Sequence, residues 1–188
     1  TVPPFVTTWV TTDGQITIPT TGGGYNYSIS WTNLTNPGDG TDGALSGRTG
    51  STSIFGLTTN DTYQVVISGA FPRIFLNNVF SNAGKIVSIE QWGGIQWQSM
   101  ADSFTGARNL VINASDSPDL SQVTSLSHMF QSVRTVNAFD NTDLSLWDVS
   151  TITDMSYLFY FSWYFNQDIS NWDVSNVTTF QYTFAGTI

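Results

Sequence analysis

The first 90 residues alternate short β-branched and aromatic runs with clusters of Gly, Asn, Asp and Pro. Such runs between turn formers are typical of β-strands. In the stretch 25–31, the side chains of Tyr25, Tyr27, Ile29 and Trp31 share one strand face, so we expect them in a core. The spacing predicts a small antiparallel sandwich. The predicted strands are Phe5–Thr11, Gln15–Ile18, Tyr25–Trp31, Ser53–Phe55, Tyr63–Ser68, Arg73–Leu76 and Lys85–Glu90.

Residues 33–53 contain many turn formers and predict a long surface loop. Asp39 and Asp42 in this loop are weak calcium candidates, because calcium prefers carboxylate oxygen. Their spacing does not fit an EF-hand-like loop. Turn chemistry is therefore the favoured interpretation of both residues.

From Trp97 onward one apolar pattern recurs, with Phe-to-Phe spacings of 26, 29 and 25 residues. Repeats of this length indicate stacked units that share a continuous core. The last unit stops inside the pattern, so we expect either further repeats or a cap at this end. The copies are Trp97-x-x-Met100-x-x-x-Phe104, Val123-x-x-Leu126-x-x-x-Phe130, Ile152-x-x-Met155-x-x-x-Phe159 and Val177-x-x-Phe180-x-x-x-Phe184.

Apolar residues at positions i, i+3 and i+7 predict a two-turn helix in each unit. Asp119, Asp148 and Asp173, each followed two residues later by Ser, are predicted to cap these helices. An extended step completes each unit. The expected fold class is α+β, with a β-rich sandwich-like part at residues 1–90 that is either a domain of its own or the cap of the solenoid. A short leucine-rich-repeat-like solenoid of about four strand and short-helix units follows at residues 91–188.

Composition narrows the classes of partner. The net charge is −9, with only five basic residues, which disfavours binding to nucleic acid or to anionic membrane surfaces. The chain has no Cys, which excludes disulfides and thiolate chemistry. No apolar run is long enough for a spanning helix. Five N-x-Ser/Thr sequons are possible glycosylation sites, at Asn26, Asn33, Asn60, Asn113 and Asn176.

No residues point to catalysis. The single histidine, His128, occupies the repeat position of Tyr157 and Tyr182 and has no second His nearby, so a metal or acid/base role is disfavoured. The segment 160–165 is too aromatic for every side chain to point inward, and we expect Tyr160, Trp163 and Tyr164 to form a binding surface. The predicted structural repeat residues are Phe104, Phe130, Trp147, Asp148, Phe159, Trp172, Asp173 and Phe184.

The blocks Trp147-Asp-Val-Ser-Thr-Ile-Thr-Asp-Met155 and Trp172-Asp-Val-Ser-Asn-Val-Thr178 carry a family signature. They resemble the BspA-like leucine-rich-repeat surface proteins of bacteria, and the resemblance covers roughly residues 71–188. The strands before it are similar to a PKD-type, Ig-like domain. The resemblance implies a secreted or surface-anchored, adhesin-like protein, and it brings no catalytic residues.

We therefore expect an extracellular binding or adhesion module without enzymatic activity or cofactor, whose ligand is a protein or a glycan on a surface. The alternative is a structural subunit of an extracellular filament or sheath. Such a subunit would assemble with copies of itself through the open repeat edge, or through strand addition by the extended residues 1–10. A carbohydrate-active enzyme is a third and weaker hypothesis. Direct membrane insertion is not expected.

Overall fold

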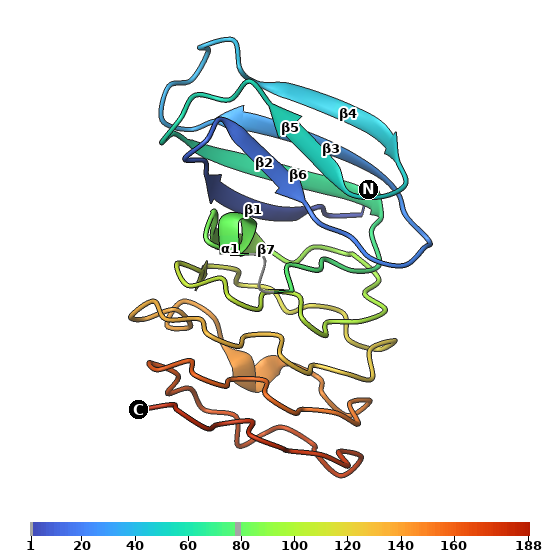
Figure 1. The fold of residues 1–188 in the computed structure, drawn as a ribbon. Helices are drawn as coiled ribbons and strands as arrows, with labels where there is room; N and C mark the ends of the chain where they lie inside the picture. Colours follow the sequence, from blue (N-terminus) through green and yellow to red (C-terminus); the bar gives the residue numbers. More distant parts are fainter. Residues whose placement is uncertain (1, 78–79) are drawn as a thin grey trace.

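The computed structural model describes residues 2–77 and 80–188. Figure 1 shows a β-rich part at one end, with the coils of the repeat region stacked below it and the C-terminus at the far end. The elements are β1 (Phe5–Val10), β2 (Gln15–Ile18), β3 (Asn26–Asn33), β4 (Gly43–Arg48), β5 (Thr52–Phe55), β6 (Thr62–Ala70), α1 (Phe80–Ala83), β7 (Ile86–Gln91), β8 (Val111–Ile112) and the 3-10 turn η1 (Leu144–Leu146).

Six strands form one sheet in the order β4-β3-β6-β1-β7-β8, and β2 pairs with β5 in a second, small sheet. The small sheet lies over one face of the large one, and its Ile16, Ile18 and Ile54 side chains are buried in the core between them (Figure 1). The predicted core face of β3 is confirmed, because Tyr25, Tyr27 and Ile29 are buried and the half-buried Trp31 packs against the same core.

Most of the predicted strands are present, with ends shifted by one or two residues. The strand predicted at Arg73–Leu76 is wrong, because this segment is hydrogen-bonded to residues that do not belong to a β-strand. The Arg73 guanidinium donates to the Ala101 carbonyl oxygen, and the Leu76 amide donates to that of Ser103. β4 was expected as loop. Its side chains are largely exposed, so the strand shows no alternation of buried positions and is defined by its pairing with β3.

β1 lies between β6 and β7 and is hydrogen-bonded to both. Residues 5–10 therefore have no free strand edge for a neighbouring molecule, which removes the basis for strand addition through them. β7 pairs in parallel with β8, so the large sheet continues from the N-terminal part into the repeat region. One buried apolar cluster runs from Phe5 to Trp172.

The α+β fold class is wrong. The described part of the chain is nearly all β-structure and turns, and its helical elements are the four-residue α1 and the three-residue η1. Neither falls on the helices predicted at residues 97–104, 123–130, 152–159 and 177–184. Each predicted helix contains a residue with φ between 55° and 58°. Such left-handed residues are incompatible with a right-handed α-helix. These residues are Asp102, His128, Tyr157 and Tyr182.

Each of these segments is instead a run of tight turns that is hydrogen-bonded to the equivalent segment of the next unit. Alternate amides bond within the turn, as in Met129 to the Leu126 oxygen at 3.0 Å. The amides between them bond to the next unit, as in Phe130 to the Leu158 oxygen at 3.0 Å. A helix and a stack of turns both bring residues i and i+3 together, which explains why the apolar spacing was compatible with either.

The predicted structural Phe positions form a ladder through the stack. The ring centroids of Phe104 and Phe130 lie 5.9 Å apart, those of Phe130 and Phe159 5.9 Å, and those of Phe159 and Phe184 5.8 Å. The three pairs are stacked with interplanar angles of 12°, 12° and 16°. Trp147 and Trp172 are also buried. The ladder is the core of the repeat region.

The recurring Asp-x-Ser pairs cap turns where helix caps were expected. The Ser121, Ser150 and Ser175 amides each donate to the Asp Oδ1 two residues earlier, at 3.0, 3.1 and 3.0 Å. Hydrogen bonds from the Ser side chain and amide lower the pKa of the Asp119, Asp148 and Asp173 carboxyls. These Asp residues occupy the same structural position in successive units.

Candidate functional site: the aromatic column

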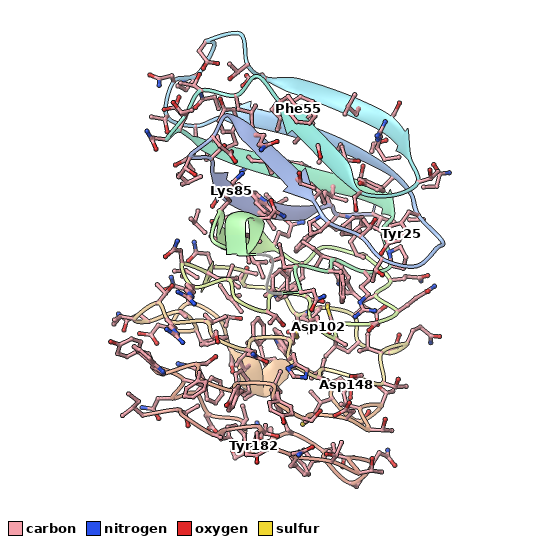
Figure 2. The ribbon with its side chains drawn as sticks, in the orientation of Figure 1. Tyr25, Phe55, Lys85, Asp102, Asp148 and Tyr182 are labelled. Atoms are coloured by element: carbon pink, nitrogen blue, oxygen red, sulfur yellow. The ribbon has the colours of Figure 1, made fainter. Side chains whose placement is uncertain are left out.

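An aromatic column runs down the surface of the repeat region. It consists of His128, Tyr157 and Tyr182, which occupy equivalent positions in successive units, together with the neighbouring Tyr160. The His128 and Tyr157 rings are parallel within 7°, with centroids 4.5 Å apart. Tyr157 and Tyr182 are 5.2 Å apart. Tyr160 meets the Tyr157 ring edge to face at 5.2 Å. In Figure 2, Tyr182 lies in the coil farthest from the sheets.

His128, Tyr157 and Tyr182 adopt a backbone conformation that bulky side chains avoid. Their φ angles are 58°, 58° and 55°, a region in which Gly or Asn is most stable. A bulky residue held there costs on the order of 1–3 kcal/mol. The corresponding position of the first unit holds Asp102, which tolerates this conformation better than an aromatic residue does. Gly or Asn would therefore give a more stable backbone at these positions than His128, Tyr157 and Tyr182 do.

The column presents ring edges and polar tips to solvent. Tyr182 is 55% exposed, and His128, Tyr157 and Tyr160 are half-buried. The facing sides of His128 and Tyr157 cover each other. What remains accessible is a row of ring edges and two kinds of hydrogen-bonding group, imidazole nitrogen and phenol oxygen. Such a surface offers amphipathic contact area with little side-chain freedom to lose on binding.

Only part of the predicted binding surface joins the column. Tyr160 contacts Tyr157, as described, and its ring centroid lies 6.1 Å from that of Tyr182 and 4.4 Å from that of Phe161, which is 40% exposed. The Trp163 ring instead packs under the Arg134 guanidinium, 4.4 Å from ring centroid to Cζ. Tyr164 is exposed.

The predicted binding surface of Tyr160, Trp163 and Tyr164 did not include His128, Tyr157 and Tyr182, although the sequence shows that these three share one repeat position. Equivalent positions of stacked units lie side by side, which is why the three rings form one column.

The calcium candidates Asp39 and Asp42 are engaged in turn hydrogen bonds. Asp39 accepts from the Thr41 amide at 2.9 Å and from the Thr58 hydroxyl at 2.9 Å, and the Thr41 hydrogen bonds are the main cause that lowers its pKa to about 2. Asp42 accepts from the Asn33 amide at 2.7 Å. Within residues 2–77 and 80–188, no group of three His, Cys, Asp or Glu side chains is arranged to hold a metal ion.

The sequons divide into accessible and inaccessible sites. Asn26, Asn60, Asn113 and Asn176 are exposed. Asn33 is fully buried, and its side-chain amide donates to Asp39 and Asp61 at 2.8 Å and to the Tyr63 hydroxyl at 3.2 Å. A glycan at Asn33 is incompatible with the folded chain, so this site is a wrong prediction.

His128 contacts the Gln131 side-chain oxygen through Nδ1, in addition to stacking on Tyr157. Both contacts are those of a packed surface residue. No helix in the described part of the chain has the length and apolar character needed to cross a membrane.

Comparison with known protein families identifies one match. Residues 74–188 match the family described as DUF285, mycoplasma proteins of unknown function, and because this match covers more than half of the chain, the protein belongs to that family. The comparisons with curated proteins and with solved structures gave no match. The family boundary at residue 74 places the whole repeat region, including the aromatic column, inside the matched segment.

Proposed function

We propose that this member of the DUF285 family is a non-catalytic binding module, displayed outside the cell, that contacts a protein partner through the aromatic column. The observation that carries the proposal is the placement of His128, Tyr157 and Tyr182 in left-handed backbone. Surface residues that oppose backbone stability are a reason to suspect selection for contact. The kinship with BspA-like surface proteins and the PKD- or Ig-like character of the N-terminal part belong to the same proposal.

A protein partner fits the geometry better than a glycan. Carbohydrate rings stack on open aromatic faces, whereas the facing sides of His128 and Tyr157 lie 4.5 Å apart and are closed to a ligand. The exposed ring edges and hydroxyls suit the mixed apolar and hydrogen-bonding surface of a protein interface. Tyr182, at the end of the column, offers the most accessible ring.

The test distinguishes a loss of binding from a loss of folding stability. A Tyr157→Gly/Tyr182→Gly variant removes two rings and relieves two strained positions, so its thermal stability is expected to equal or exceed that of the parent chain. Binding is measured by biolayer interferometry against a panel of immobilised extracellular matrix and serum proteins, with a glycan array in parallel. Binding to a protein of the panel, weakened at least about tenfold in the variant, supports the proposal; a hot-spot residue carries roughly 2 kcal/mol or more.

The matched control is Tyr164→Ser, which removes an exposed aromatic outside the column. It is expected to retain full binding. Binding that survives the double Gly substitution, binding to glycans alone, or no binding to any protein of the panel would overturn the proposal.

A further inference from the structure

The repeat region meets the N-terminal part along a polar trough. Two adjoining hollows form the trough, with volumes of about 600 and 240 Å³, and the Gln98 side chain lines both. The larger hollow lies between Gln96, Gln98, Ser121 and Gln122. Its volume is within the range of about 300–1,000 Å³ that ligand sites occupy, and such sites are common where two structural parts meet.

The smaller hollow lies where the loop between β2 and β3 reaches the first coil of the repeat region (Figure 1). Gly22, Gly23 and Tyr25 of this loop line it, together with Pro72 and Arg73. The Tyr25 hydroxyl donates to the Arg73 carbonyl oxygen at 2.9 Å, which holds the loop against that segment. The walls of the trough therefore come from segments that are far apart in the sequence and are fixed to one another.

The glutamine side chains point outward because the residue between them is buried. Trp97 is fully buried, whereas Gln96 and Gln98 on either side of it are exposed. The Gln98 amide donates to the Pro72 carbonyl oxygen at 2.9 Å, and Gln96 forms a parallel β-bridge with the next unit. Backbone pairing on both sides thus fixes the segment from which the two side chains project.

The trough offers neutral polar groups and no free charge. In the described part of the chain, the side-chain amides of Gln96 and Gln98 have no hydrogen-bond partner. Arg73 is the one charged residue among the described lining residues, and its Nη2 already donates to the Ala101 oxygen at 2.6 Å. None of these lining residues is acidic, although the chain has 14 acidic residues. A cationic ligand would therefore find no carboxylate here.

One wall of the smaller hollow carries a glycine that the fold does not require. Gly22 has a φ of 81°, which favours glycine, but Gly23 does not have a positive φ. A Cβ atom at Gly23 would meet no atom within 4 Å. The backbone would therefore accept a larger residue at this position, and the glycine leaves the polar backbone groups of the wall accessible.

We propose that the trough binds a neutral oligosaccharide. Each glutamine amide presents a donor and an acceptor side by side, and the adjacent hydroxyls of a sugar both donate and accept. An apolar ligand would leave these amides without partners, which costs binding energy. A peptide that adds as a strand finds no free edge here, because the backbone of Gln96 and Gln98 is already paired. The site goes beyond the proposed function, since none of its residues belongs to the aromatic column.

The test measures binding of the whole chain to an array of neutral, sialylated and sulfated glycans, and then affinities by isothermal titration calorimetry. We expect the chain to prefer neutral glycans. The Gln96→Ala/Gln98→Ala variant removes two amides that have no partner in the chain, so its melting temperature should equal that of the parent. Its affinity should fall at least about tenfold. Gly23→Leu retains both amides and should weaken binding by a similar factor, because its side chain narrows the trough.

The matched control is Gln181→Ala, which removes an exposed glutamine outside the trough and should bind as the parent chain does. The Tyr157→Gly/Tyr182→Gly variant should also retain glycan binding, so this proposal and the proposed function can fail separately. The proposal is refuted if the parent chain binds no neutral glycan, or if it prefers charged ones. Full binding by either trough variant, or equal loss in the control or column variant, refutes it as well. So does a peptide, found on a peptide array, that occupies the trough in place of a glycan.

Discussion

Replacement of Phe130 by Ala removes the central rung of the Phe ladder and tests how the repeat region is held together. The ring is 1% exposed and stacks on Phe104 and Phe159, both at 5.9 Å. It also meets Phe139 edge to face at 5.2 Å. Core Phe→Ala substitutions cost about 3–5 kcal/mol, and each aromatic pair adds roughly 0.5–1.5 kcal/mol beyond burial. We expect a loss of about 4 kcal/mol in the free energy of unfolding.

The matched substitution is Phe184→Ala, in the same repeat position at the end of the ladder. Phe184 is 44% exposed, so a little over half of its surface is removed from water. A fully buried Phe side chain contributes about 1.5–3 kcal/mol, which scales to roughly 1–2 kcal/mol here. Its ring neighbours are Phe159 at 5.8 Å and Phe165 at 6.1 Å. The losses in the two variants should therefore differ by about 2–3 kcal/mol.

Urea unfolding followed by tryptophan fluorescence and far-UV circular dichroism measures both losses, and coincident transitions justify the two-state treatment. The reasoning fails if Phe184→Ala destabilises the chain as much as Phe130→Ala, because the ladder would then not depend on neighbours on both sides. It also fails if Phe130→Ala costs less than about 1 kcal/mol.

Three further substitutions probe single contacts. Asn33→Ala leaves the buried partners of this amide unsatisfied and should lower the free energy of unfolding by about 1–3 kcal/mol in urea titrations. Trp172→Phe removes the indole donor from the Leu144 oxygen at 2.7 Å and should cost about 1–3 kcal/mol, more than Trp147→Phe, whose indole nitrogen has no partner in the described chain. The ion pair with Lys85 holds the pKa of the Asp13 carboxyl well below its usual range. The stability that ionised Asp13 contributes to the folded chain is fully present above the unfolded pKa near 4 and is lost as the pH falls towards the lower folded pKa. The Asp13→Asn variant lacks this contribution at every pH, so its melting temperature should decline less steeply below pH 4 than that of the parent chain.

Structural features that depend on short stretches of sequence could be predicted from the sequence alone. Alternation in 25–31 identified the buried face of β3, and the Phe spacings identified the rungs of the ladder. The Asp-x-Ser pairs were predicted as helix caps, whereas the Ser150 amide and the Asp148 carboxylate cap a turn. The predictions of the buried face and of the rungs held because side-chain periodicity is a property of the local sequence.

The sequence by itself therefore determined the core face of β3, the Phe positions of the ladder and how often the unit recurs. Tertiary structure decided the backbone conformation of each unit, because apolar spacing does not specify the sign of φ at Tyr157 or Tyr182, and bonds between units do. It also decided that Asn33 is buried and that His128 stacks on Tyr157. Both outcomes depend on segments at least 28 residues apart in sequence coming together, as Asn33 does with Asp61.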